Sequence, residues 1–76
     1  MRMSNARIAA DPGIMMGKPC IKGTRITVEL ILRKLGDGRS IADILEAYPQ
    51  VTEDDVRAVL SFAADYLQHE TVLAAE

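Results

Sequence analysis

Apolar residues recur with a helical period in the second half of the chain. From Val28 to Leu35 they follow the i, i+3, i+4, i+7 spacing of a single helix face. Thr27 precedes this stripe as the expected N-cap, and the Gly-Asp-Gly run at 36–38 follows it with residues that commonly end helices. This spacing predicts a first helix that begins after Thr27 and ends near residue 36.

Capping signals predict two further helices. Ser40 is followed by Asp43, and Thr52 by Asp55; both pairs have the spacing of a capping box, in which each residue's side chain bonds the other's backbone N–H. Pro49 ends the second helix, because the residue before a proline is pushed out of the helical region. We expect the third helix to run to about residue 68. Its expected buried stripe is Val56, Val59, Leu60, Ala63 and Leu67.

Residues 7–28 have short apolar and β-branched runs between turn residues. Residues 7–10 predict a short strand, and the Asp-Pro-Gly run at 11–13 predicts a turn. We expect a tight hairpin in which residues 20–21 and 25–28 flank Lys22 and Gly23, since glycine takes a positive φ at little cost. The pair Met15 and Met16 suits either an apolar contact patch or core filling.

The complete pattern predicts a disordered arm over residues 1–6 and a single, mainly α domain over 7–76. The expected fold is a trihelical unit preceded by a short N-terminal β hairpin. Its second and third helices are separated by a connection close to that of a helix-turn-helix.

Size and cysteine content limit how this domain is stabilised. A chain of 76 residues builds a thin core, and natural domains of this size rely on disulfides, a metal or association. One cysteine and one histidine exclude an internal disulfide and argue against a zinc site. We therefore expect a homodimer, in which the β element pairs across the two-fold axis or protects its edge. The lone thiol, without a secretory signal or a long apolar run, predicts a cytoplasmic protein with no membrane span.

The net charge of -2 hides an asymmetry between the two halves of the chain. Residues 1–36 contain seven cations and two acids, a net charge of +5, whereas residues 37–76 contain two cations and nine acids, a net charge of -7. Such a split indicates two different electrostatic surfaces, although both halves would also be acceptable as ordinary solvated surface. We expect the basic string from Gly17 to Val28 to be the contact surface for a partner of opposite charge.

No catalytic constellation is found in the sequence. The glycine-rich run at 17–23 lacks the Gly-Lys-Ser/Thr ending of a phosphate-binding loop. His69 is expected at an exposed helix end, and Cys20 in a strand pattern is expected to be a small buried residue. We therefore expect a protein that is not an enzyme and needs no cofactor or metal. The candidate residues for binding a protein or nucleic acid are Lys18, Lys22, Thr24, Arg25, Arg33, Lys34 and Arg57.

The second and third predicted helices give evidence both for and against DNA binding. The connection between the second and third helices favours it, but the third helix opens with the acids of residues 53–55 and has only Arg57 as a cation. Bound DNA would therefore contact the cations of residues 18–34, with the hairpin as the reading element. A trihelical unit that serves only as a scaffold is an equally good interpretation.

Four parts of the chain carry a family resemblance. They are Ile8 with the Asp-Pro pair at 11–12, the string Gly-Lys-Pro-Cys-Ile-Lys-Gly-Thr-Arg from Gly17 with the Ile-Thr-Val that follows it, the Tyr-Pro pair at 48–49, and residues 52–56. Together they resemble the small prokaryotic domain-of-unknown-function family 433 from about Ile8 to Leu67. The string is specific, and Cys20 stands where an aliphatic residue is usual.

The resemblance implies a homeodomain-like, trihelical fold and an antitoxin of a type II toxin–antitoxin system. Such an antitoxin is encoded beside a PIN-like ribonuclease toxin, which it inhibits, and binding of DNA at its own operon is a second implied role. Two modes of inhibition follow from the charge split: Lys22 or Arg25 pairs with the toxin's metal-binding carboxylates, or the acidic third helix covers its RNA-binding cations. The alternative function is a stand-alone DNA-binding regulator without a toxin.

Overall fold

The computed structural model describes residues 5–69, which form a two-stranded sheet followed by three helices. The strands are β1 (Ile8–Ala9) and β2 (Cys20–Ile21), with a short 3-10 turn, η1 (Met15–Gly17), between them. The helices are α1 (Val28–Gly36), α2 (Ile41–Ala47) and α3 (Glu53–Gln68). The predicted mainly α fold with an N-terminal β hairpin is confirmed.

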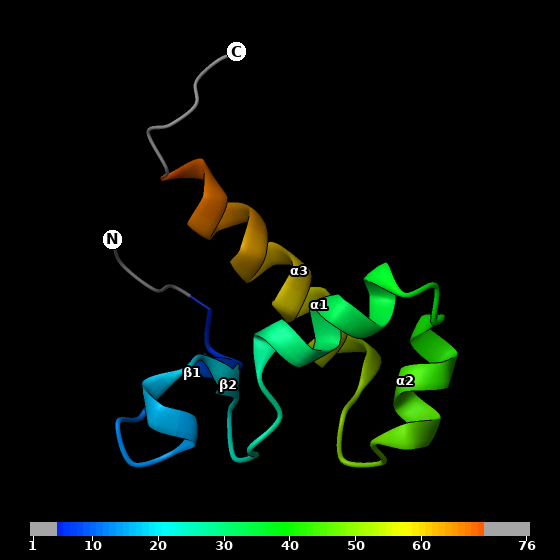
Figure 1. The fold of residues 1–76 in the computed structure, drawn as a ribbon, viewed down its shortest axis with the longest axis horizontal. Helices are drawn as coiled ribbons and strands as arrows, with labels where there is room; N and C mark the ends of the chain where they lie inside the picture. The colour runs from blue at the N-terminus through cyan, green and yellow to red at the C-terminus, as the bar shows by residue number, and fades with distance from the viewer. Residues whose placement is uncertain (1–4, 70–76) are drawn as a thin grey trace.

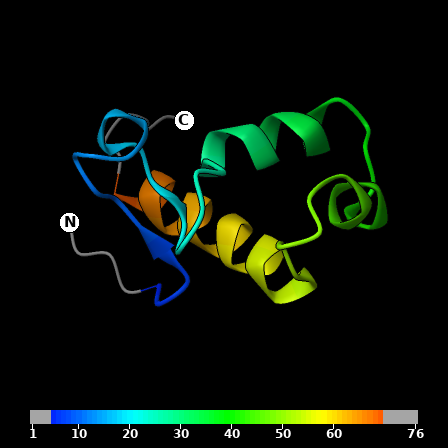
Figure 2. The ribbon, with the colours of Figure 1, turned by 90° about the horizontal axis from the view of Figure 1, so that it is seen from below.

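α1 and α3 cross as the central pair of the molecule. In Figures 1 and 2, α2 lies at one end of this pair and the two strands lie at the other end. The core between these elements is made almost entirely of β-branched residues, which pack well in a small space. Its buried members are Ile8, Ile21, Ile26, Val28, Ile31, Ile44, Val51, Val56, Val59 and Phe62.

All three predicted helix starts are confirmed by their caps. The Thr27 hydroxyl accepts a hydrogen bond from the Leu30 N–H at 3.0 Å, and both predicted capping boxes are formed. In α2 the Asp43 N–H donates to the Ser40 hydroxyl at 3.0 Å, while the Asp43 carboxylate accepts from the Ser40 N–H at 3.0 Å. These local rules fixed the starts of the helices because they depend only on residues four positions apart or fewer.

β2 has the predicted partner only in part, and it has a second partner, β1, that was not predicted. β2 pairs antiparallel with β1, in the register Ile8 to Ile21 and Ala9 to Cys20. Residues 25–28 add a single bridge, between Cys20 and Thr27. The pairing stops there because Thr27 already serves as the N-cap of α1, so the chain leaves the sheet to begin a helix.

The buried face of α3 is rotated from the predicted stripe. Ala58 and Phe62 are buried, whereas Leu60 and Leu67, which the stripe included, are 43% and 65% exposed. Leu60, in the middle of the helix, lies outside both the core and the pocket-lining residues. Leu67 is exposed because of the length of the helix: α3 has 16 residues, against 9 in α1 and 7 in α2. Its last two turns therefore extend past the body of the domain (Figure 1), where the described residues offer them little to pack on.

The predicted arm falls partly within the described residues. The Asn5 side chain donates from Nδ2 to the Ala58 carbonyl of α3 at 2.9 Å, so the chain is fixed to the domain from this residue on. Residues 1–4, and the part of the chain after His69, lie outside the described residues. None of the helices within residues 5–69 is long and apolar enough to cross a membrane.

Candidate functional site

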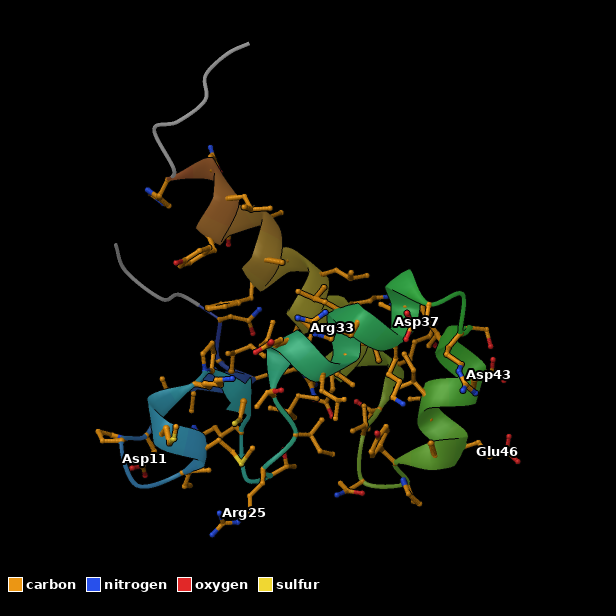
Figure 3. The ribbon with its side chains drawn as sticks, in the orientation of Figure 1. Asp11, Arg25, Arg33, Asp37, Asp43 and Glu46 are labelled. Carbon is orange, nitrogen blue, oxygen red and sulfur yellow. The ribbon has the colours of Figure 1, made fainter. Side chains whose placement is uncertain are left out.

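The turn at residues 22–25, which we call the cationic turn, projects two positive side chains from a fixed backbone. Gly23 takes a φ of 81°, and the Thr24 N–H donates to the Ile21 carbonyl at 3.0 Å. Lys22 and Arg25 are exposed, and neither forms an ion pair with a described residue. Figure 3 shows Arg25 pointing away from the body of the molecule, well apart from Arg33 on α1.

Thr24 holds the cationic turn in shape through its side chain. Its hydroxyl donates to the Ile21 carbonyl at 2.8 Å and accepts from the Ile26 N–H at 3.0 Å. The Lys22 N–H also donates to the Arg7 carbonyl at 2.7 Å, which fixes the turn to the start of β1. The Thr24 hydroxyl thus uses its proton and one of its two lone pairs inside the turn.

Three of the other predicted cations are paired with acids of the domain itself. Glu29 accepts from Lys18 at 3.1 Å and from Arg33 at 3.5 Å. The Lys18 hydrogen bond and charge, with Arg33 beside them, hold the pKa of Glu29 below its usual value. Arg57 pairs with two acids of its own helix, Glu53 at 3.1 Å and Asp54 at 3.6 Å. These cations are therefore partly neutralised, unlike those of the cationic turn.

Lys34 belongs neither to the cationic turn nor to the ion pairs of Glu29 and Arg57. It is half-buried at the end of α1 and borders a small hollow of about 80 Å³ together with Arg39 and Tyr48. Arg39 was not among the predicted site residues, although it is exposed. The structure thus divides the predicted basic surface into a free turn, two internal ion-pair groups and a separate region near α2.

Asp55 is a buried acid whose partner the sequence did not reveal. Its carboxylate accepts from the Thr52 N–H at 3.0 Å and from Arg7 Nη1 at 2.9 Å. Burial opposes the ionisation of Asp55, but the hydrogen bonds from Thr52 and Arg7 outweigh it and hold the pKa below its usual value. This pair connects the start of β1 to the start of α3, residues 48 positions apart, and no local pattern announces such a contact.

An apolar groove lies between α1 and the last two turns of α3, with a volume of about 560 Å³. Its rim carries the Lys18, Glu29 and Arg33 group. Its floor and walls are lined by Pro19, Val28, Leu32, Phe62, Ala63, Tyr66 and Leu67. The sequence did not predict this groove, because the predicted buried stripe of α3 included Leu67. The available signal was that the apolar pattern of α3 is longer than the patterns of α1 and α2.

The residues that could hold a metal or act as a nucleophile or base lie apart from one another in the described part of the chain. Within residues 5–69, no three His, Cys, Asp or Glu side chains come together in a way that would hold a metal ion. Cys20 is buried in β2, and His69 is exposed as the C-cap of α3. The surface features of the described residues that could contact a partner are the two cations of the cationic turn and the apolar groove.

These features define a small three-helix domain with a two-stranded sheet before its first helix. The chain belongs to the DUF433 family, described as proteins of unknown function, whose sequence profile matches residues 8–63. This match begins at β1 and ends within α3, so it covers the elements that build the core.

Two relatives show how the domain occurs elsewhere. The uncharacterized protein y4eO of Sinorhizobium fredii is 29% identical over 56 residues, which is 74% of this chain and 25% of that protein. The crystal structure of a DUF433 member from Anabaena variabilis aligns with a TM-score of 0.77 at 26% identity, over 82% of this chain and 61% of that one. The chain thus spans about a quarter of one relative's length and about three fifths of the other's.

Proposed function

We propose that this chain is a non-catalytic antitoxin that binds and inhibits a PIN-like ribonuclease toxin through the cationic turn. The observation that carries the proposal is the pair Lys22 and Arg25, two exposed cations without an acidic partner among the described residues, on a turn fixed by Thr24. A fixed turn supports binding because fewer degrees of freedom are lost when a partner is bound.

The proposed target chemistry is a cluster of carboxylates, the kind of group with which a PIN-type nuclease holds its metal ions. An arginine matches a carboxylate with two parallel hydrogen bonds, and a lysine adds a point charge. In this mechanism Arg25 and Lys22 occupy the acidic centre and keep substrate and metal from it. The antitoxin needs no cofactor of its own for this role.

The alternative mode, in which the acidic start of α3 covers the toxin's RNA-binding cations, has less support. Asp55 is buried and occupied by Thr52 and Arg7, and Glu53 is paired with Arg57. The acids at this helix start therefore serve the domain's own cap and ion pairs. A partner would have to compete with those internal contacts to use them.

A charge reversal tests the cationic turn directly. The double substitution Lys22→Glu and Arg25→Glu should weaken binding to the adjacent PIN-like nuclease by at least about 100-fold, since each of the two lost charged contacts removes on the order of 1.5–3 kcal/mol. The measurements are calorimetric binding and inhibition of ribonuclease activity. Arg39→Glu is the matched control, because it reverses an exposed cation outside the turn; equal inhibition by all three proteins would refute the proposal.

A stand-alone DNA-binding regulator is the second candidate, and the observation in its favour is the unpaired cations of the turn. The five residues between α2 and α3 also suit a helix-turn-helix, and the homeodomain-like assignment remains a prediction. Against it, Arg57 at the start of α3 is paired with acids that repel phosphates. Phosphate contacts would make affinity for an operator fragment fall steeply with salt, and affinity equal to that for random DNA would remove this candidate.

A further inference from the structure

The last two turns of α3 expose apolar side chains where a projecting helix normally carries charges. Leu67 and Tyr66 are 65% and 51% exposed, and from Leu60 to Gln68 the sequence has one charged residue, Asp65. Helices that face water are polar over most of that face. An exposed apolar surface next to an apolar groove marks a place where another protein surface packs.

We propose that two copies of the chain form a two-fold symmetric dimer, in which the last two turns of α3 from each copy fill the groove of the other. The groove and the projecting helix end belong to one continuous surface, so a single two-fold rotation satisfies both grooves at once and closes the assembly. Ala63, which lines the groove, and Ala64 beside it are small enough for two antiparallel helices to approach to about 8–10 Å.

The charges of the molecule favour this occupant. The last two turns of α3 carry one charge, that of Asp65, whereas the rim of the groove, with Lys18, Glu29 and Arg33, has a net charge of +1. Antiparallel pairing through the helix ends keeps the two acidic helix starts apart. Each helix is about 24 Å long, so the starts are separated by more than the roughly 8 Å over which salt screens their repulsion.

The proposed dimer replaces the β-mediated one that the sequence suggested. Strands of two residues each present few backbone groups to a second copy, whereas the groove presents a large apolar surface. Lys22 and Arg25 do not line the groove, so the dimer would display two cationic turns and does not depend on the antitoxin role.

The size of the proposed dimer interface determines the affinity that we expect. The groove and the exposed helix end supply on the order of a dozen residues per copy, against about 20–30 in a standard interface. The dimer is therefore expected to be weak, with dissociation in the micromolar range, and must be examined over about two decades of concentration.

Sedimentation equilibrium on the full chain tests the proposal. The wild-type mass should rise with concentration toward twice that of the 8.3 kDa chain. Leu67→Asp should remain at the mass of a monomer, with an unchanged helical circular dichroism spectrum because the side chain is largely exposed. Met16→Asp is the matched control: it places the same charge at an 87% exposed methionine outside the groove and should dimerise like the wild type.

Cross-linking locates the dimer interface without a variant that fails to dimerise. Ala63→Cys, on the groove side of α3, should form a disulfide-linked dimer under mild oxidation, while Ser61→Cys, an exposed residue that does not line the groove, should not. A wild-type protein that stays monomeric at every concentration overturns the proposal, and this is also the result expected if a different protein fills the groove. A dimer that survives Leu67→Asp and is cross-linked only through Ser61→Cys overturns it equally.

Discussion

At the scale of single residues, the Asp55 carboxylate combines a helix cap with an ion pair to a distant part of the chain. It closes the capping box of α3 with Thr52 and receives Arg7 from the start of β1. Asp43 occupies the same position in the capping box of α2, but it is exposed and no described arginine pairs with it. Substituting each aspartate in turn therefore compares the stability that a cap contributes with the stability that a cap and a long-range ion pair contribute together.

Asp55→Asn should lower the free energy of unfolding by about 2 kcal/mol, whereas Asp43→Asn should lower it by clearly less. The difference arises because Asp55 also loses a charged hydrogen bond with Arg7, and half of the Arg7 side chain is exposed, which limits its contribution. Urea unfolding of the two variants measures both values. Equal losses would show that the Arg7 contact adds nothing to the cap.

At the scale of elements, the helix starts were predictable and the strand partner was not. Capping boxes are read within four residues, so Ser40 and Thr52 located α2 and α3 directly. The pairing of β2 with β1 crosses a loop of ten residues, whereas the predicted partner, residues 25–28, adds a single bridge before α1 begins. The position of the cationic turn was likewise predictable, since a glycine between two basic residues is a local feature.

The buried face of α3 depends on neighbours that no local pattern identifies. Leu60 fits the helical apolar stripe as well as Val59 does, yet Val59 is fully buried and Leu60 lies outside the groove and the core. α1, α2 and β1 all contact α3, and Val59 belongs to the core that these elements form, whereas Leu60 does not. The groove was not predicted for the same reason. It forms where α3, the longer helix, continues past its contacts with α1.

The smaller side chain of this neighbouring pair should matter more to stability. Val59→Ala should cost about 2 kcal/mol, because it leaves a cavity in a close-packed core. Leu60→Ala removes a larger apolar group but should cost less than about 1 kcal/mol, since its side chain already meets water. Chemical denaturation of both variants gives the comparison, and a greater loss for Leu60→Ala would mean that this side chain is buried in solution.

At the scale of the whole molecule, the domain depends on carboxylates that stay ionised. Glu29, Asp43 and Asp55 each have a pKa held below the ordinary value by hydrogen bonds or positive neighbours. The three are spread over α1, α2 and α3, so every helix has one. Acid should therefore loosen the fold in all three helices rather than at one site.

The direction of this effect follows from proton binding. A carboxyl group whose pKa is lower in the folded state binds its proton more readily in the unfolded state, so acid favours unfolding. The contribution of Asp55 is fully present above its ordinary pKa of 3.8 and is lost as the pH falls from there through the lower pKa of the folded state. Stability measured by urea unfolding should thus be flat near neutral pH and fall steeply once the solution becomes more acidic than this value. The stability of the Asp55→Asn variant should fall less steeply over the same pH range, because an asparagine side chain has no carboxylate to protonate. An unchanged slope would place the acid sensitivity in Glu29 and Asp43 alone.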